Sequence, residues 1–194
     1  MKLFFHYCSY GFSNCYVLSD EDTSGSSAII IDPGCMDKPL LEYIETNELN
    51  LKAVLITHDH LGHVYGLRTL KRIYDAQIFA INSTVLDIDT KQIKDGEKFN
   101  VGPFSIEAIS IPGHSADSVV YCIGNFLFTG DVLTAGLVGS TASGYGARTQ
   151  INKLRSHLLS LPGDYLVFPG HGPPSTLEAE RRFNIGIAHN STVS

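Results

Sequence analysis

Short apolar runs, each followed by a turn of glycine, proline or polar residues, recur along this chain. Runs of this length are typical of buried or half-buried strands, and Phe104 to Ile111 also alternates apolar with polar positions. We therefore predict strands over residues 3–7, 15–18, 28–31, 53–56, 77–81, 104–111, 119–123, 126–128 and 166–168.

Apolar residues at helical spacing lie between these predicted strands. Asp37 is a suitable N-cap for a helix with Leu41 and Ile44 on its inner face. Three further helices are predicted from Val64, Leu67 and Leu70, from Ile151, Leu154 and Leu158, and over residues 176–183. Because strands and helices alternate, we expect sheets covered by helices.

The stretch from Gly136 to Arg148 carries no such pattern. It is rich in glycine and small residues, which favour irregular backbone. We interpret it as a long loop, with Gly139 to Arg148 in a position to act as a lid over a site.

Three histidines follow the apolar strand that ends at Ile56. They lie in the stretch Thr57-His58-Asp59-His60-Leu61-Gly62-His63, in a loop between a strand and a helix. Imidazole is a common metal ligand, and His58 and His60 are spaced so that both can point toward one ion in an extended loop. We predict a metal site here, in preference to a chance cluster of surface histidines.

The same arrangement of strand, glycine turn and metal-binding side chain occurs three more times. The blocks are Pro112-Gly113-His114-Ser115, Phe128-Thr129-Gly130-Asp131 and Pro169-Gly170-His171-Gly172-Pro173. Strand ends often deliver functional groups to one edge of a sheet, so His114, Asp131 and His171 are further candidate ligands.

These four blocks, in this order, resemble the metallo-β-lactamase superfamily, and the chain looks most like its small glyoxalase II-like members. The resemblance implies an α/β fold of four layers, an αββα sandwich of two mixed β-sheets flanked by helices. It further implies that His58, His60 and His114 hold a first metal, with Asp131 as a shared ligand. His63 and His171 would help to hold a second metal.

One position departs from the family signature. The signature Thr-His-x-His-x-Asp-His has an aspartate where this chain has Gly62, so the second metal lacks a charged ligand. Asp59 is close in sequence, but its side chain should point away from the ion in a loop of alternating direction. We expect Asp59 to contact neighbouring residues, while a water could fill the missing ligand position.

By resemblance, the chain is a metal-dependent hydrolase that acts on a thioester, a lactone or a similar acyl substrate. The catalytic groups would be a metal-bound water and Asp131, and the cofactor would be one or two zinc ions, with iron or manganese as other choices. Two alternatives remain. One is an oxidoreductase similar to the mononuclear iron persulfide dioxygenases, and the other is a metal-binding protein without catalysis.

The composition indicates how many domains the chain has, which partners it excludes and where the protein is located. The 194 residues are 43% hydrophobic and 18% charged, as is usual for one globular domain, and we expect a single domain over residues 1–194. The net charge of −6 argues against nucleic acid as a partner, and no apolar run is long enough to span a membrane. Four scattered cysteines and the absence of a signal-peptide pattern favour a cytoplasmic protein.

The remaining histidines match no motif block. They are His6, His157 and His189, and we expect them to be ordinary surface or packing residues.

Overall fold

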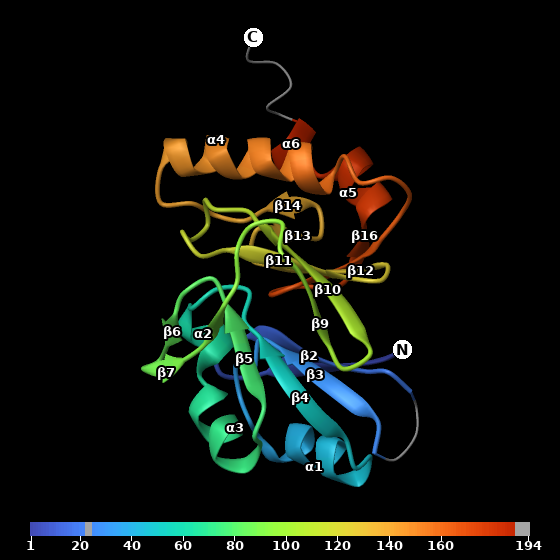
Figure 1. Ribbon diagram of the computed structural model, residues 1–194. Helices are drawn as coiled ribbons and strands as arrows, with labels where there is room; N and C mark the ends of the chain where they lie inside the picture. The colour runs from blue at the N-terminus through green and yellow to red at the C-terminus, as the bar shows by residue number, and fades with distance from the viewer. Residues whose placement is uncertain (22–24, 189–194) are drawn as a thin grey trace.

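The chain folds into two β-sheets that pack face to face, with helices on both outer sides (Figure 1). This is a computed structural model, and it describes residues 1–21 and 25–188. His189 lies outside the described residues. The predicted αββα sandwich is confirmed, because each sheet has both parallel and antiparallel neighbours.

The first sheet has the strand order β1-β2-β3-β4-β5-β8. Its first three strands are antiparallel neighbours, and the strands from β3 onward run parallel. The strands are β1 (Lys2–Cys8), β2 (Ser13–Ser19), β3 (Ser27–Ile31), β4 (Asn50–Leu55), β5 (Gln77–Ala80) and β8 (Lys91–Gln92). Its outer face is covered by α1 (Lys38–Thr46), α2 (Leu61–Val64) and α3 (Leu67–Ile73).

The second sheet has the strand order β16-β15-β12-β11-β10-β9. Only β12 and β15 run parallel among its described strands. The strands are β9 (Lys98–Val101), β10 (Phe104–Ser110), β11 (Val119–Ile123), β12 (Phe126–Gly130), β15 (Leu166–Pro169) and β16 (Ser175–Thr176). Its outer face carries α4 (Gly144–Lys153), a π-helical turn (Leu154–Leu158), α5 (Leu177–Phe183) and α6 (Ile185–Ala188).

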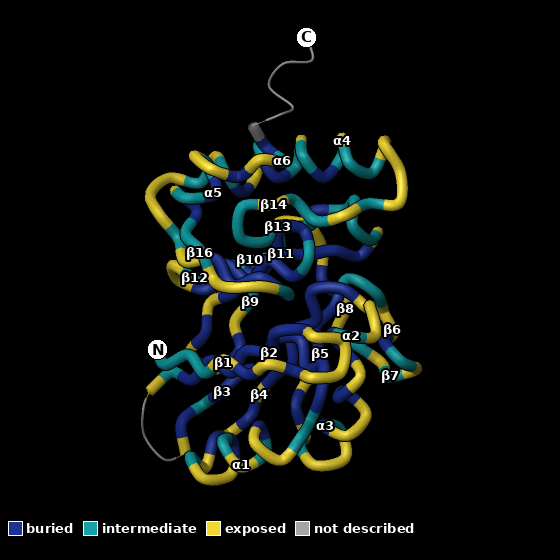
Figure 2. Tube along the Cα trace, turned by 180° about the vertical axis from the view of Figure 1, so that it is seen from behind, coloured by how far each residue is buried: buried dark blue, intermediate teal, exposed yellow. Residues whose placement is uncertain are grey.

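Buried apolar side chains form three clusters, one at each interface between neighbouring layers of helices and sheets. The layer between the sheets includes Tyr16, Phe79, Tyr121 and Phe128, and Figure 2 shows the buried backbone there in dark blue. The other two layers lie beneath the helices on either side. No helix in residues 1–21 and 25–188 has the length and apolar character needed to cross a membrane.

Most predicted elements are present, with local differences. The helix after Asp37 begins as expected, since the Asp37 side chain accepts a hydrogen bond from the Leu40 N–H, but its buried residues are Leu40 and Ile44. The helix predicted from Val64 to Leu70 is divided at Tyr65 and Gly66, although Val64, Leu67 and Leu70 are all fully buried. Any side chain at Gly66 would collide with the backbone of Pro33 and Cys35, so α2 and α3 pack closely against the end of β3.

The prediction of a long loop from Gly136 to Arg148 is wrong. A small hairpin of β13 (Leu133–Thr134) and β14 (Leu137–Val138) occupies its start, and α4 begins at Gly144. The side chain of Ser143 accepts a hydrogen bond from the Gly146 N–H and so caps this helix. A second small hairpin, β6 (Thr84–Val85) and β7 (Ile88–Asp89), was also not expected from the sequence.

Candidate metal centre

Six candidate ligands meet where the two sheets face each other at one edge. The first sheet contributes His58, His60 and His63, from the loop and helix that follow β4. The second sheet contributes His114 after β10, Asp131 after β12 and His171 after β15. The ligand set therefore spans the interface between the sheets.

Hydrogen bonds between the sheets hold these loops together. The Val119 N–H donates to the Thr57 carbonyl at 2.9 Å, which places the end of the His114 loop beside the His58 loop. Asn14 donates through its side chain to the carbonyls of Pro169 and Gly172, on either side of His171. This positioning role of Asn14 is not visible in the local sequence pattern, because its partners lie 155 and 158 residues away.

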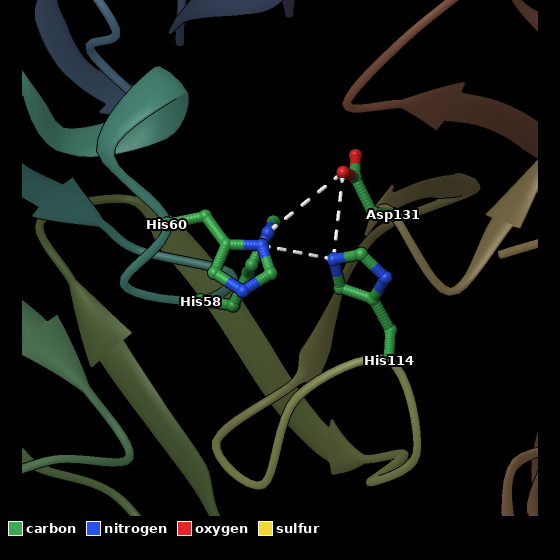
Figure 3. Close-up of side chains that lie close together, drawn as sticks. All are labelled: His58, His60, His114 and Asp131. Atoms are coloured by element: carbon green, nitrogen blue, oxygen red, sulfur yellow. Dashed lines mark hydrogen bonds and ion pairs between the residues drawn. The ribbon is translucent and has the colours of Figure 1, made fainter. Parts of the chain in front are cut away.

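Donor atoms of His58, His60, His114 and Asp131 all lie within 4.8 Å of one another. Figure 3 shows His58 and His60 approaching from one side, and His114 and Asp131 from the other. The Asp131 Oδ2 atom is 3.8 Å from His58 Nε2 and 3.6 Å from His114 Nε2. His114 Nε2 is 3.0 Å from His60 Nδ1.

A second set shares Asp131. His63, Asp131 and His171 also bring their donor atoms within 4.8 Å of one another. His63 Nε2 is 3.5 Å from Asp131 Oδ1, and His171 Nε2 is 3.5 Å from Asp131 Oδ2. Oδ2 therefore lies near His58, His114 and His171, and Oδ1 lies near His63, so the carboxylate of Asp131 contacts both sets.

Gly170 makes this approach possible. A Cβ atom at this position would collide with Asp131 Oδ1 and would lie 2.6 Å from His63 Cε1. The glycine before His171 is therefore needed for close packing against the site.

The hydrogen-bond partners of four imidazoles determine which nitrogen carries the proton. The Nδ1 atom of His114 donates to the Ser140 carbonyl. The Nδ1 atom of His171 donates to the Phe12 carbonyl, and that of His63 donates to Asp32. His58 Nδ1 lies 3.1 Å from the Thr57 hydroxyl, whose own proton goes to Asp32 Oδ2, so His58 is again the donor. In all four rings, Nε2 faces Asp131.

Asp32 is a supporting residue for which the sequence analysis assigned no role. Its carboxylate is buried, accepts hydrogen bonds from the Thr57 N–H and hydroxyl, and contacts His63 Nδ1 at 3.0 Å. Asp32 follows β3 and Thr57 follows the parallel neighbour β4, so the two strand ends meet at one edge. The position of Asp32 at the end of a predicted strand, like that of Thr57, was the feature of the sequence that could have indicated this contact.

Asp59 points away from the candidate ligands, as expected. Its Oδ2 accepts a hydrogen bond from Asn82, and its backbone N–H donates to Asp117. His157 is exposed and contacts Ser156, in line with an ordinary surface residue. His6, in contrast, is buried beside two cysteines, which the sequence analysis did not foresee.

The electrostatics of the cluster favour a cation. Burial, followed by the nearby charge of His63, lowers the pKa of His58 to about 3. Burial would also lower the pKa of His63, but the carboxylates of Asp131, 3.5 Å from its Nε2, and of Asp32 outweigh it and raise this pKa to about 10. Burial would raise the pKa of Asp131, yet His63 and the other nearby imidazoles lower it to about 2. The two carboxylates thus favour positive charge in the cluster.

The residues fit a metal ion. Four buried side-chain atoms have no hydrogen-bond partner in the described chain. Three of them, His58 Nε2, His63 Nε2 and Asp131 Oδ1, belong to candidate ligands, and the fourth is Gln150 Oε1. Unpaired buried polar groups are costly, and these three belong to the converging donor sets. Beside them lies an open cavity of about 320 Å³, with His114, Asp131 and His171 on one side and Leu137, Val138 and Gly139 among its other walls.

Comparison with known proteins agrees with this geometry. The family model described as "Metallo-beta-lactamase superfamily" matches residues 9–86. The chain is 30% identical to hydroxyacylglutathione hydrolase GloC of Haemophilus influenzae, over 88% of this chain and 91% of that protein. It is also 30% identical to the probable polyketide biosynthesis zinc-dependent hydrolase BaeB of Bacillus velezensis, over 88% of this chain and 80% of that protein.

Solved structures show the same fold. ETHE1 from Myxococcus xanthus superposes with a TM-score of 0.83 at 25% identity, over 100% of this chain and 92% of that one. TTHA1623 in a di-iron-bound form superposes with a TM-score of 0.76 at 26% identity, over 94% and 98% of the two chains. The ordered motif blocks, the shared fold and relatives that align along most of their length lead to one conclusion: this chain belongs to the metallo-β-lactamase superfamily.

Proposed function

We propose that the protein is a zinc-dependent hydrolase that acts on a thioester, a lactone or a similar acyl compound. The observation that carries the proposal is the convergence of His58 Nε2, His63 Nε2 and Asp131 Oδ1, which are buried and have no hydrogen-bond partner among the described residues. Hydrolase-named relatives, among them a zinc-dependent one, support the reaction class and the metal.

The ligand roles follow from the two donor sets. His58, His60, His114 and Asp131 would hold the first ion, and His63, His171 and Asp131, as a shared ligand, a second one. When bound, zinc supplies Lewis acidity, which lowers the pKa of a water from about 15.7 toward about 7 and polarises a carbonyl.

The chain's own residues prepare the site for this chemistry. Asp131 stays ionised at neutral pH because its pKa is about 2, so it can accept a hydrogen bond from the attacking water and orient it. The Nδ1 hydrogen bonds of His58, His63, His114 and His171 fix the direction of each ring. Leu137 and Val138 offer apolar walls for the acyl chain, next to His114 and His171.

Hydrolysis assays on the zinc-loaded chain test the proposal. S-lactoylglutathione is the first substrate, followed by short acyl thioesters and lactones. We expect zinc-dependent turnover that His114→Ala abolishes and that His157→Ala, a change of an exposed histidine, leaves intact. Turnover at background level on every member of the series in the metal-loaded wild type would refute the hydrolase proposal.

A second candidate, an iron-dependent oxidoreductase of the persulfide dioxygenase type, is favoured by Gly62. Because Gly62 has no side chain, the second set has three donor residues and no additional carboxylate, which suits a mononuclear centre. His58, His114 and Asp131 would form the two-histidine, one-carboxylate triad of non-haem iron enzymes. Oxygen uptake by the iron-loaded chain with glutathione persulfide would favour this candidate over the hydrolase.

A further inference from the structure

A second group of metal-binding side chains lies beneath the first sheet, on its helix-covered side. His6 and Cys8 come from β1, and Cys35 comes from the segment between β3 and α1. His6 Nε2, Cys8 Sγ and Cys35 Sγ all lie within 4.8 Å of one another. The three residues are buried, with exposed fractions of 9%, 0% and 9%.

Strand alternation and a close backbone contact bring these residues together. Residues 4, 6 and 8 of β1 share one face, and Phe4 stacks on Tyr43 of α1 with 3.6 Å between ring centroids. Gly34, directly before Cys35, lies against the Gly62 carbonyl so closely that a Cβ atom there would collide with it. The backbone directly before Cys35 is therefore packed closely against α2.

Two further groups extend the cluster. Cys15 is paired with His6 across β1 and β2, and its thiol raises the pKa of Cys8. Asp37 Oδ1 lies 2.9 Å from His6 Nε2, and Cys35 Sγ lies 3.5 Å from the same nitrogen. The Asp37 side chain is 38% exposed and therefore connects the buried donors with solvent.

Simple packing does not account for this cluster. A buried cysteine alone behaves as a small apolar residue, but a buried imidazole between two thiols and a carboxylate is polar and needs partners. A nucleophilic thiol is also a poor explanation, since contact with Cys15 together with burial raises the pKa of Cys8 to about 12.

The spacing suits tetrahedral coordination. Zinc lies about 2.3 Å from cysteine sulfur and about 2.0–2.1 Å from histidine nitrogen, which separates neighbouring ligands in a tetrahedron by roughly 3.5–3.8 Å. The distance between His6 Nε2 and Cys35 Sγ, 3.5 Å, falls in this range.

We propose that His6, Cys8 and Cys35 form a separate binding site for one thiophilic divalent ion, zinc first, with Asp37 or a water at the fourth position. Binding releases one proton from each of the two thiols, so the thiolates become the ligands. The ion would join β1 to the segment that carries Cys35. This segment begins with Asp32, and the Asp32 side chain contacts His63. The role would be structural, and the proposal does not rest on the proposed hydrolase activity.

Cobalt(II) distinguishes this site from the centre at Asp131. Only thiolate ligands produce a sulfur-to-cobalt charge-transfer absorption, and the six candidate ligands at the other centre contain no sulfur. In the double variant His58→Ala His114→Ala we expect this absorption to saturate at one cobalt per chain. Adding Cys8→Ser should abolish it, whereas Cys122→Ser, a change in the second sheet, should leave it unchanged.

A wild-type chain that binds cobalt without the charge-transfer absorption would overturn the proposal, even if the cysteine variants fail to fold. An absorption that survives both Cys8→Ser and Cys35→Ser would overturn it as well. His6→Asn, whose shorter polar side chain does not reach the position of Nε2, gives a second variant, and circular dichroism checks its folding. We expect it to weaken cobalt binding at least tenfold.

Discussion

At the scale of single residues, the carboxylate of Asp32 connects Thr57 with His63 behind the candidate ligands. Asp32 Oδ2 accepts the Thr57 hydroxyl proton and contacts His63 Nδ1, and Asp32 holds a left-handed backbone conformation with φ of 50°. Asparagine also tolerates this conformation, so Asp32→Asn changes the chemistry while it preserves the backbone.

We expect Asp32→Asn to weaken metal binding at the His63 position by about 10–100-fold. The amide NH₂ would replace an oxygen that accepts protons, so His63 would have to reverse its tautomer and would lose the lone pair at Nε2. Zinc affinity measured by competition with a chromophoric chelator tests this. Asp59→Asn is the matched control, and equal affinities for wild type and Asp32→Asn would contradict the role of Asp32.

The family signature has an aspartate at the position of Gly62, and restoring it tests whether that carboxylate would bind a second metal. A Cβ atom at Gly62 would make only ordinary contacts with the Gly11 backbone, the nearest atom lying at 3.5 Å, so a side chain can be added here. Gly11 precedes Phe12, whose carbonyl binds His171. We expect Gly62→Asp to increase the affinity for a second metal at least tenfold, as measured by stepwise titration. Gly62→Asn has the same size without the charge, and an equal gain in both variants would show that the carboxylate is not a ligand.

At the scale of secondary-structure elements, local patterns predicted most of the fold, and tertiary contacts explain the rest. The strands beside each motif block were predictable because apolar runs and glycine turns are local signals. The start of α4 was not, because Gly144 and Gly146 oppose helix formation, and the Ser143 cap and close packing compensate for them: a Cβ at Gly146 would lie 3.2 Å from the Gly113 carbonyl. The contacts of Asp32 with Thr57 and His63, and those of His6 with Cys35 and Asp37, were missed because these partners lie far away in the sequence.

Gln150 of α4 contacts the segment that follows Asp131, and we predict that it stabilises the fold. This residue is fully buried, and its side-chain NH₂ donates to the carbonyls of Val132 and Gly139. Gln150→Ala would remove this donor from the Gly139 carbonyl and leave the Val132 carbonyl with the Gly139 N–H alone, so we expect the free energy of unfolding to fall by about 1–3 kcal/mol. Denaturant unfolding measures this. Gln92→Ala, at an exposed glutamine, should stay within about 0.5 kcal/mol of wild type, and an equally small change for Gln150→Ala would refute the prediction.

At the scale of the whole molecule, the candidate centre joins the two halves of the sandwich. Each sheet supplies three of the six candidate ligands, and a bound ion would therefore link the sheets across their shared edge (Figure 3). An ion that binds the folded chain and not the unfolded one stabilises the fold by mass action, by about 4 kcal/mol at a concentration of 1,000 times its Kd. The proposed thiol site would act only within the first sheet.

Because one site would link the two sheets and the other would lie within the first sheet, variants of each site can show which ion stabilises the fold. We expect a strong chelator to lower the Tm of the wild-type chain, because both sites lose their ions. In Cys8→Ser, a chelator-dependent shift should remain, accompanied by faster hydrogen exchange in the loops around residues 57–63 and 112–118. In His58→Ala His114→Ala, the shift should persist without that change in the loops. A chelator effect that vanishes in Cys8→Ser would mean that the centre at Asp131 does not bind metal tightly enough to hold the two sheets together.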